Sequence, residues 1–274
     1  MTTPREAARA LAGRLSEAGI EDATLEAEVI VRTAARLSRV QLYAGACGNL
    51  SALPELVERR LAHEPLAYIT GTREFYGHEF TVGPGVLIPR PESEILVDLA
   101  LAEIERAPGS RVLDVGTGSG CIACSIALGR RDGGRTSACD VSLAVLQAGR
   151  GNATALGAVV DFFRSDLASA TGGADIVVAN LPYIPTRTID GLAPEVRDWE
   201  PALALDGGCE GIELVGRLIA DCATRLRPWF LALEIDPAQA PRVTVMLGEG
   251  GAVDICTHRD LTGRERIVSA RWAR

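Results

Sequence analysis

Apolar residues recur every three or four positions from residue 4 to about residue 70, which is the spacing of amphipathic helices. We expect three short helices, whose apolar stripes are Ala7, Ala10, Leu11 and Leu15; Leu25, Val29 and Thr33; and Leu53, Leu56, Val57 and Leu61. Asp22 is placed to cap the second helix, and Pro65 closes the third. Residues 1–70 are therefore expected to form a small helical bundle, which either recognises a partner or only stabilises the fold.

The pattern changes at Gly71, where aromatic and β-branched residues replace the helical stripes. These residues surround Gly77 over positions 75–82, and Gly83-Pro84-Gly85 marks a turn directly afterwards. We expect residues 71–90 to form a β-hairpin that connects two domains.

The hairpin leads into Arg90-Pro91-Glu92-Ser93-Glu94, followed by a helical apolar stripe. Pro91 suits the first turn of a helix because its missing N–H costs nothing there, and the two glutamates favour the positive end of the helix. Capping explains the carboxylates but not the paired prolines beside Arg90. Arg90 and Glu92 are therefore also candidates to face a site.

Strands and helices alternate from residue 111 to the end of the chain. The expected strands are 112–115, 137–141, 161–163, 175–179, 229–235, 252–257 and 265–270, and the expected helices are 121–129, 143–156, 212–226 and 237–247. This alternation predicts an α/β fold over residues 91–274, Rossmann-like, with a mostly parallel seven-stranded sheet and helices on both faces. In such a sheet, ligands bind at the carboxyl edge beside the first strand.

Composition and charge narrow the functional classes. The 274 residues carry a formal net charge of −8, which argues against an extended nucleic-acid surface. No apolar run is long enough to cross a membrane and no signal-peptide pattern is present, so we expect a cytoplasmic protein. Cys121 and Cys124 have CxxC spacing, but without a second pair or clustered histidines we expect them to pack in a helix, and no metal site is predicted.

A glycine-rich turn, made of Gly116, Thr117, Gly118, Ser119 and Gly120, follows the first strand of the predicted sheet. It lets the backbone approach a ligand closely, with the amino terminus of a helix directly behind it. The dinucleotide fingerprint has Cys121 where its third glycine belongs, and only a looser register ending in Ala123 remains. A Walker A motif is excluded because no Gly-Lys-Ser/Thr follows.

Three aspartates lie at neighbouring strand ends. Asp140 ends the second strand and can accept both hydroxyls of a ribose. Asp166 is placed to meet an adenine amino group, with Leu167 against the ring, and Asp114 holds either the loop or a ligand amine. Each aspartate alone is equally explained as a turn cap. Together they predict an adenosine-containing ligand without pyrophosphate, which S-adenosylmethionine fits best.

The strand over 175–179 leads into Asn180-Leu181-Pro182-Tyr183. A planar amide or aryl amine has a delocalised nitrogen lone pair, and two acceptors on its N–H bonds would orient the nitrogen for methyl transfer. The Asn180 side-chain oxygen and the Leu181 carbonyl are such acceptors, Pro182 keeps residue 181 extended, and Tyr183 packs on the planar group. This chemistry needs positioning and electrostatics rather than a strong base. A stiff loop in which Asn180 only caps a turn is the alternative.

These segments together resemble the release factor glutamine methyltransferase family, which methylates the glutamine amide nitrogen of the Gly-Gly-Gln motif in peptide chain release factors. The resemblance spans essentially the whole chain and rests on residues 70–76, 87–94, 113–120 and 180–183. It implies a class I methyltransferase that binds S-adenosylmethionine through Gly116 to Gly120, Asp140, the Leu167 region and Asn180, and that yields S-adenosylhomocysteine.

The resemblance also implies a substrate glutamine held by Asn180, the Leu181 carbonyl and Tyr183. We expect Phe75, Arg90, Pro91 and Glu92 to complete the substrate site. The helical domain is expected to help dock the release factor, and a monomer is expected.

Two positions depart from the family pattern. Leu181 replaces a proline, although the carbonyl on which the chemistry depends is kept, and Asn-Leu-Pro-Tyr is the form seen in enzymes resembling ribosomal RNA adenine dimethylases. Leu167 stands where an aromatic residue is common, so stacking on adenine should be weaker.

Four other functions are compatible with parts of this pattern. A methyltransferase acting on adenine in nucleic acid shares the 180–183 motif but conflicts with the acidic balance. A methyltransferase acting on a small-molecule amide or amine stays open because of Leu181. A non-enzymatic binding protein predicts a broken motif, whereas Asn180, Pro182 and Tyr183 are intact. A dehydrogenase would not use the 180–183 motif in its reaction.

Overall fold

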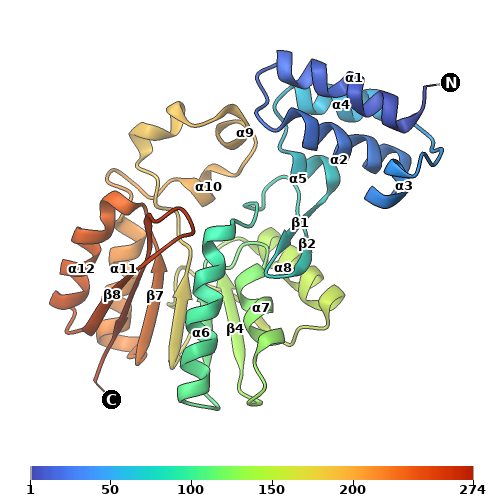
Figure 1. Ribbon diagram of the computed structural model, residues 1–274. Helices are drawn as coiled ribbons and strands as arrows, with labels where there is room; N and C mark the ends of the chain where they lie inside the picture. Colours follow the sequence, from blue (N-terminus) through green and yellow to red (C-terminus); the bar gives the residue numbers. More distant parts are fainter. Residues whose placement is uncertain (1, 274) are drawn as a thin grey trace. The chain divides into compact units, whose positions relative to one another are not determined.

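The computed structural model describes residues 2–273, which divide into two compact units (Figure 1). The first unit contains the chain up to Thr72 together with Ala193–Trp199, and the second contains Arg73–Leu192 and the chain from Glu200 onward. The predicted fold class is confirmed: a mostly parallel seven-stranded sheet with helices, preceded by a helical region and a two-stranded sheet. No helix within residues 2–273 is both long and apolar enough to cross a membrane.

The first unit is helical, as predicted, but it contains more helices than the three expected. They are α1 (Pro4–Glu17), α2 (Ala23–Ala35), α3 (Arg39–Tyr43), α4 (Leu53–Leu61), α5 (Leu66–Thr70) and α9 (Pro194–Arg197). Helix α1 begins at a capping box, in which Thr3 Oγ1 accepts from the Glu6 N–H at 3.2 Å and Glu6 Oε2 accepts from the Thr3 N–H at 2.8 Å.

The predicted apolar stripe of α2 is wrong. Leu25 is 52% exposed, and the residues that α2 buries are Ala23, Ala27, Ile30, Val31 and Ala35. Asp22 stands at the amino-terminal cap but makes no capping hydrogen bond with its side chain. The packed face therefore uses small and β-branched residues, and the larger leucine points to solvent.

Arg60 explains why residues 193–199 belong to the helical unit. Its guanidinium is only 4% exposed and pairs with the carboxylates of Glu26 and Glu195, the latter at 2.9 Å. Trp199 adds a hydrogen bond from its indole N–H to the Ala62 carbonyl at 3.2 Å. A buried guanidinium is tolerated only when its donors are satisfied, so Glu195 is part of this core. No pattern in the sequence assigned this segment to the helices.

The second unit is built on seven strands in the order β5-β4-β3-β6-β7-β9-β8. Their bounds are β3 (Val112–Val115), β4 (Thr136–Asp140), β5 (Asp161–Arg164), β6 (Ile176–Ala179), β7 (Phe230–Glu234), β8 (Val253–Arg259) and β9 (Glu265–Arg271). The strands from β5 to β7 are parallel, and β9 lies antiparallel between β7 and β8. The order places β3 and β6 side by side, so their carboxyl ends meet.

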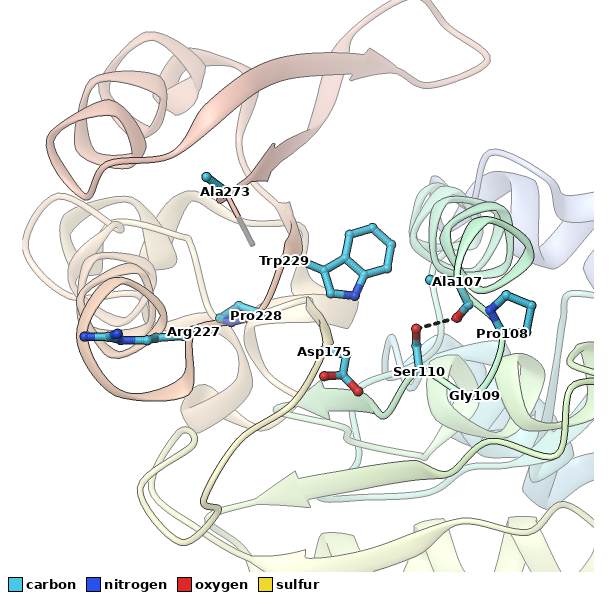
Figure 2. Close-up of a pocket in the computed structure, with 9 residues that line it drawn as sticks. All are labelled: Ala107, Pro108, Gly109, Ser110, Asp175, Arg227, Pro228, Trp229 and Ala273. Atoms are coloured by element: carbon cyan, nitrogen blue, oxygen red, sulfur yellow. Dashed lines mark hydrogen bonds between the residues drawn. The ribbon is translucent and has the colours of Figure 1, made fainter.

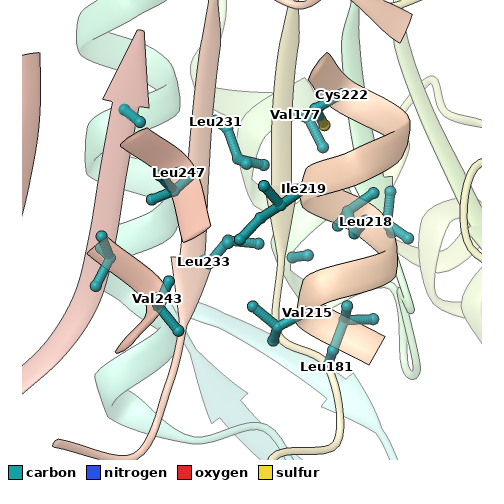
Figure 3. Packing of buried hydrophobic residues seen from close by; sticks show 14 of the residues in the cluster. Val177, Leu181, Val215, Leu218, Ile219, Cys222, Leu231, Leu233, Val243 and Leu247 are labelled. Atoms are coloured by element: carbon teal, nitrogen blue, oxygen red, sulfur yellow. The ribbon is translucent and has the colours of Figure 1, made fainter. Parts of the chain in front are cut away.

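Helices cover both faces of this sheet, as predicted. They are α6 (Glu94–Arg106), α7 (Cys121–Gly129), α8 (Leu143–Leu156), α10 (Ala202–Leu205), α11 (Glu213–Asp221) and α12 (Ala240–Glu249). Alternate strand residues form two cores: Val177 and Leu231 pack with α11 and α12 (Figure 3), while Ile176 and Val178 pack with α6 and α7. Cys121 and Cys124 are buried in α7, as expected.

The predicted hairpin consists of β1 (Thr72–Phe75) and β2 (His78–Thr81). Asn152 of α8 ties β2 to the glycine-rich turn. Its side chain accepts from the Thr81 N–H at 2.8 Å and donates to the carbonyls of Thr81 and Ser119 at 3.0 and 2.9 Å. Since Asn152 is buried, these bonds fix the hairpin against one side of the candidate site.

Candidate active site

The glycine-rich turn lies at the carboxyl end of β3, as predicted. The N–H groups of Gly116 and Thr117 donate to the Cys139 carbonyl at 2.9 and 3.0 Å, so β4 anchors the turn. Gly118 has a φ of +57°, and a Cβ added there would meet no atom within 4 Å. The open side of the turn is therefore bare backbone, which is what a closely approaching ligand requires.

Asp140 lies beside this turn at the end of β4. Its carboxylate accepts from the Gly118 N–H at 3.2 Å and from the Ser142 N–H at 3.0 Å. The side chain remains partly exposed, so it can still receive ribose hydroxyls. The turn and Asp140 thus fit the sugar end of a nucleoside-containing cofactor.

Asp114 holds the turn through one of its carboxylate oxygens. It is fully buried in β3, and the Thr117 hydroxyl donates to Asp114 Oδ2 at 2.6 Å. Burial, partly opposed by this hydrogen bond, raises the pKa of Asp114 to about 7. Of the two predicted roles, the structure shows the one in which Asp114 supports the loop.

Asp166 and Leu167 are the two residues predicted to contact adenine, and both have protein partners in the structure. Asp166 is exposed and pairs with Arg217 at 2.7 Å. Leu167 is buried among core residues, with its carbonyl accepting from the Cys139 thiol at 3.2 Å and its backbone in the left-handed region at φ +49°. The side chain of Leu167 therefore serves in packing, and its contact with an adenine ring stays a prediction.

Asn180 and Tyr183 share a hydrogen-bond network that motif analysis did not predict. Asn180 Nδ2 donates to Ser93 Oγ at 2.9 Å, and the Ser93 hydroxyl donates to Glu234 Oε2 at 2.5 Å. The Tyr183 hydroxyl donates to Glu234 Oε1 at 3.4 Å. A single carboxylate at the end of β7 therefore organises both polar side chains of the 180–183 motif.

Tyr183 remains a neutral phenol in this setting. Burial, with a smaller contribution from the nearby charge of Glu234, raises the pKa of Tyr183 well above its ordinary value. The residue as a whole is partly exposed.

Leu181 joins the glycine-rich turn to the 180–183 motif. Its side chain is buried at the end of the α11 core, next to Val215 (Figure 3). A Cβ added at Gly116, where φ is +75°, would lie 2.9 Å from Leu181 Cδ2. Since the leucine side chain is directed into the core, it is the backbone of residue 181 that remains a candidate for the site.

Residues 205–211 support the backbone after the motif. Ile184 forms a parallel bridge with Asp206, and its N–H donates to the Leu205 carbonyl at 3.1 Å. Gln239 Nε2 donates to the carbonyls of Tyr183 and Gly211 at 2.8 and 3.1 Å. These contacts fix the backbone of Tyr183 and of the residue after it.

Sequence reasoning missed Glu234 and Gln239 as site residues. The available signal for Glu234 was a single carboxylate that ends the otherwise apolar strand β7 (Phe230–Glu234). The signal for Gln239 was a capping box that starts at Asp236, which accounts for the glutamine oxygen but leaves its NH₂ group free to bind the Tyr183 carbonyl.

The four remaining predicted substrate residues have different positions. Phe75 is corrected to a core residue: it is 1% exposed and packs edge-on against Phe80, with ring centroids 6.1 Å apart.

Arg90 forms an ion pair with the buried Glu200, whose Oε2 also accepts from the Ile88 N–H at 3.1 Å. Pro91 begins a short 3₁₀ turn, Pro91–Ser93, as its missing N–H allows. Glu92 is partly buried and close enough to Glu234 to raise its pKa.

Glu200→Gln should lower the free energy of unfolding by about 1–3 kcal/mol, because Arg90 loses a charged partner and one amide oxygen must serve two donors. Urea unfolding followed by circular dichroism measures this. Asp161→Asn is the matched control, since its pair with Arg135 is exposed on both sides and should change stability by less than about 1 kcal/mol. Equal losses in the two variants would contradict a structural role for Glu200.

A hollow outside this site lies at the opposite edge of the sheet. It measures about 450 Å³ and is lined by residues that precede β3, β6 and β7, among them Ser110, Asp175 and Trp229 (Figure 2). Ligands of open α/β sheets bind at the carboxyl edge, so this hollow is not the candidate site. Within residues 2–273, no group of three or more His, Cys, Asp or Glu side chains is arranged to hold a metal ion.

Comparison with known proteins agrees with this geometry. Models of two protein families match the chain: the PrmC N-terminal domain over residues 6–71 and the methyltransferase small domain over residues 92–192. A release factor glutamine methyltransferase from Geobacter sulfurreducens is 38% identical over 268 residues, covering 94% of this chain and 93% of the relative. One from Gloeobacter violaceus is 39% identical over 273 residues, covering 95% of each.

One solved structure has a similar fold over most of the chain. The 16S rRNA N2 G1207 methyltransferase of T. Thermophilus, in complex with AdoMet and guanosine, matches with a TM-score of 0.52 and 22% identity, covering 74% of this chain and 50% of that one. At this identity the likeness shows the fold alone.

Proposed function

Because the chain belongs to the release factor glutamine methyltransferase family, we propose that Asn180, the Leu181 carbonyl and Tyr183 hold the glutamine amide of a release factor for methylation. The enzyme is an S-adenosylmethionine-dependent methyltransferase that modifies glutamine in release factors. The proposed acceptor is the N5 nitrogen of the glutamine in the Gly-Gly-Gln motif, and the by-product is S-adenosylhomocysteine.

The observation that carries this assignment is the orientation of the Asn180 amide. Its NH₂ group donates to Ser93 at 2.9 Å, so the carbonyl oxygen of the same planar amide is directed away from Ser93. No hydrogen bond to Asn180 Oδ1 is found within residues 2–273. The oxygen is available to accept from a substrate N–H.

Cofactor binding would use the turn Gly116–Gly120 and the Asp140 carboxylate, whose geometry fits a nucleoside. Bound S-adenosylmethionine supplies a methyl group on a sulfonium, which is electrophilic without further activation. Leu181 packs against Gly116, so the substrate-holding backbone is fixed directly to the cofactor turn.

The residues of this chain act on the substrate amide. Asn180 Oδ1 and the Leu181 carbonyl accept from its two N–H bonds, which orients the nitrogen and favours the pyramidal geometry of the transition state. Tyr183 packs on the amide plane. Methylation would leave the substrate nitrogen cationic and acidic, so its excess proton would pass to water and no strong base would be required.

The domain roles are part of the same proposal. Residues 1–70 would dock the release factor, 71–90 would connect, and 91–274 would carry the chemistry. We also propose that the enzyme acts in the cytoplasm as a monomer and has no extended nucleic-acid surface. Light scattering coupled to size-exclusion chromatography tests the monomer, and a dimer mass would contradict it.

The substrate is tested by supplying labelled cofactor to parallel acceptors: a purified release factor, the same factor with its Gly-Gly-Gln glutamine changed to alanine, ribosomal RNA, and free small amides. We expect label only in the unaltered release factor. Label confined to RNA would favour an adenine methyltransferase, and label confined to the free amides would favour a small-molecule enzyme. Either result would overturn the release factor assignment.

A further inference from the structure

The buried hydrogen-bond chain behind the site runs from Glu234 through Ser93 to Asn180. Ser93 is 2% exposed and Glu234 is 1% exposed, so neither exchanges its partner with bulk water. The donor–acceptor distances are 2.5 Å from Ser93 Oγ to Glu234 Oε2 and 2.9 Å from Asn180 Nδ2 to Ser93 Oγ. The Tyr183 hydroxyl donates to the other carboxylate oxygen of Glu234, Oε1.

We propose that Ser93 and Glu234 are positioning residues that set the polarity of the Asn180 amide, so that its oxygen faces the substrate. The proposal rests on the function proposed above. A serine hydroxyl has one proton to donate, and an ionised carboxylate can only accept. With its proton held by Glu234, Ser93 can only accept from Asn180. Asn180 must therefore present NH₂ to Ser93 and oxygen to the site.

The reverse arrangement is the competing state. A protonated Glu234 could donate to Ser93, which would release the serine proton toward Asn180. The Asn180 amide would then be favoured with its oxygen on Ser93 and its NH₂ group toward the substrate. Two N–H donors would face the N–H bonds of the glutamine amide, and the acceptor needed for methyl transfer would be lost.

The surroundings of Glu234 set the pH at which the Asn180 amide reverses its orientation. Burial is the largest effect and raises the pKa of Glu234 to about 7; Glu92 raises it too, while the hydrogen bonds from Ser93 and Tyr183 and the charge of Arg266 lower it. The acceptor-only state is the ionised one. Methyl transfer should therefore increase as pH rises through about 7 and decrease as pH falls.

The test compares kcat, KM and cofactor Kd for wild type, Ser93→Ala, Ser93→Thr and Glu234→Gln between pH 6 and 9. Ser93→Ala should lower kcat about 10- to 100-fold with cofactor Kd unchanged, because the Asn180 amide is no longer held. Ser93→Thr keeps the hydroxyl and should restore most of the rate. Glu234→Gln cannot titrate and should lose the acid limb of the wild-type profile.

A wild-type kcat in Ser93→Ala, or an unchanged acid limb in Glu234→Gln, would overturn the proposal. Thermal unfolding of each variant separates misfolding from mispositioning, and Ser93→Thr serves as the folded reference.

A second readout needs no substrate. The side-chain amide resonances of Asn180, followed by ¹⁵N NMR, should shift with pH in wild type and not in Glu234→Gln. If the wild-type enzyme methylates no release factor but these resonances titrate as expected, the proposed substrate is wrong and the proposed positioning network is supported. If the enzyme turns over and the resonances do not respond, the network is wrong and the function stands.

Discussion

Asn180→Ala should lower methyl transfer to a release factor by roughly 100- to 1,000-fold while leaving S-adenosylmethionine affinity nearly unchanged. The substitution removes the acceptor proposed to orient the substrate nitrogen, and loss of one preorganised group at a reacting centre has an effect of this size. The cofactor turn does not depend on it, since Gly116 and Thr117 are anchored to Cys139. Single-turnover kinetics and calorimetric titration of the cofactor measure the two quantities.

Asn180→Asp is the shape-matched comparison for this result. It keeps an acceptor of the same size but cannot donate to Ser93, and its charge would lie near the buried Glu234. We therefore expect a loss comparable to that of the alanine variant. Full turnover in Asn180→Ala would contradict the role assigned to the amide, and lost cofactor affinity would move Asn180 to the cofactor site.

Gly211→Ala should destabilise the protein and disable the site together. Gly211 has a φ of +76°, and a Cβ there would overlap the Tyr183 carbonyl oxygen and lie 2.8 Å from Gln239 Nε2. A side chain at positive φ costs about 1–2 kcal/mol by itself, and the forced shift should add about 1–3 kcal/mol. Because the displaced atoms support Tyr183, we expect a fall in turnover of around 100-fold.

Gly251→Ala isolates the backbone contribution. Gly251 also has a φ of +76°, but a Cβ there would meet nothing within 4 Å. It should lose only about 1–2 kcal/mol and keep its turnover. Urea unfolding and steady-state rates of the two variants give the comparison. Equal stability losses, or normal turnover in Gly211→Ala, would contradict the crowding inferred behind Tyr183.

The sheet and the motif were predictable because both are encoded locally. Apolar runs separated by turn residues specify a parallel sheet, and Gly116–Gly120 and Asn180 follow their strands directly in sequence. The stripe expected for α2 was wrong because small residues such as Ala27 form its packed face, and alanine gives a weaker hydrophobic pattern than leucine. Phe75 was misassigned since a buried aromatic and a substrate-facing one have the same local pattern.

Non-local contacts account for what sequence reasoning missed. Ser93 and Glu234 are 141 positions apart and meet only after the sheet has formed. Glu195 is 135 positions from Arg60, and its segment is surrounded in sequence by residues of the other unit. Periodicity reports which face of an element is buried, but not which distant partner satisfies a buried charge.

The return of residues 193–199 to the helical unit limits how the chain can be divided. The polypeptide passes from one unit to the other after Thr72, after Leu192 and after Trp199. A truncation that begins at residue 73 would leave Glu195 without Arg60 and Trp199 without the Ala62 carbonyl. The helical unit is thus interlaced with its neighbour in sequence. It cannot be grafted or exchanged as a simple amino-terminal cassette unless this second segment is transferred with it.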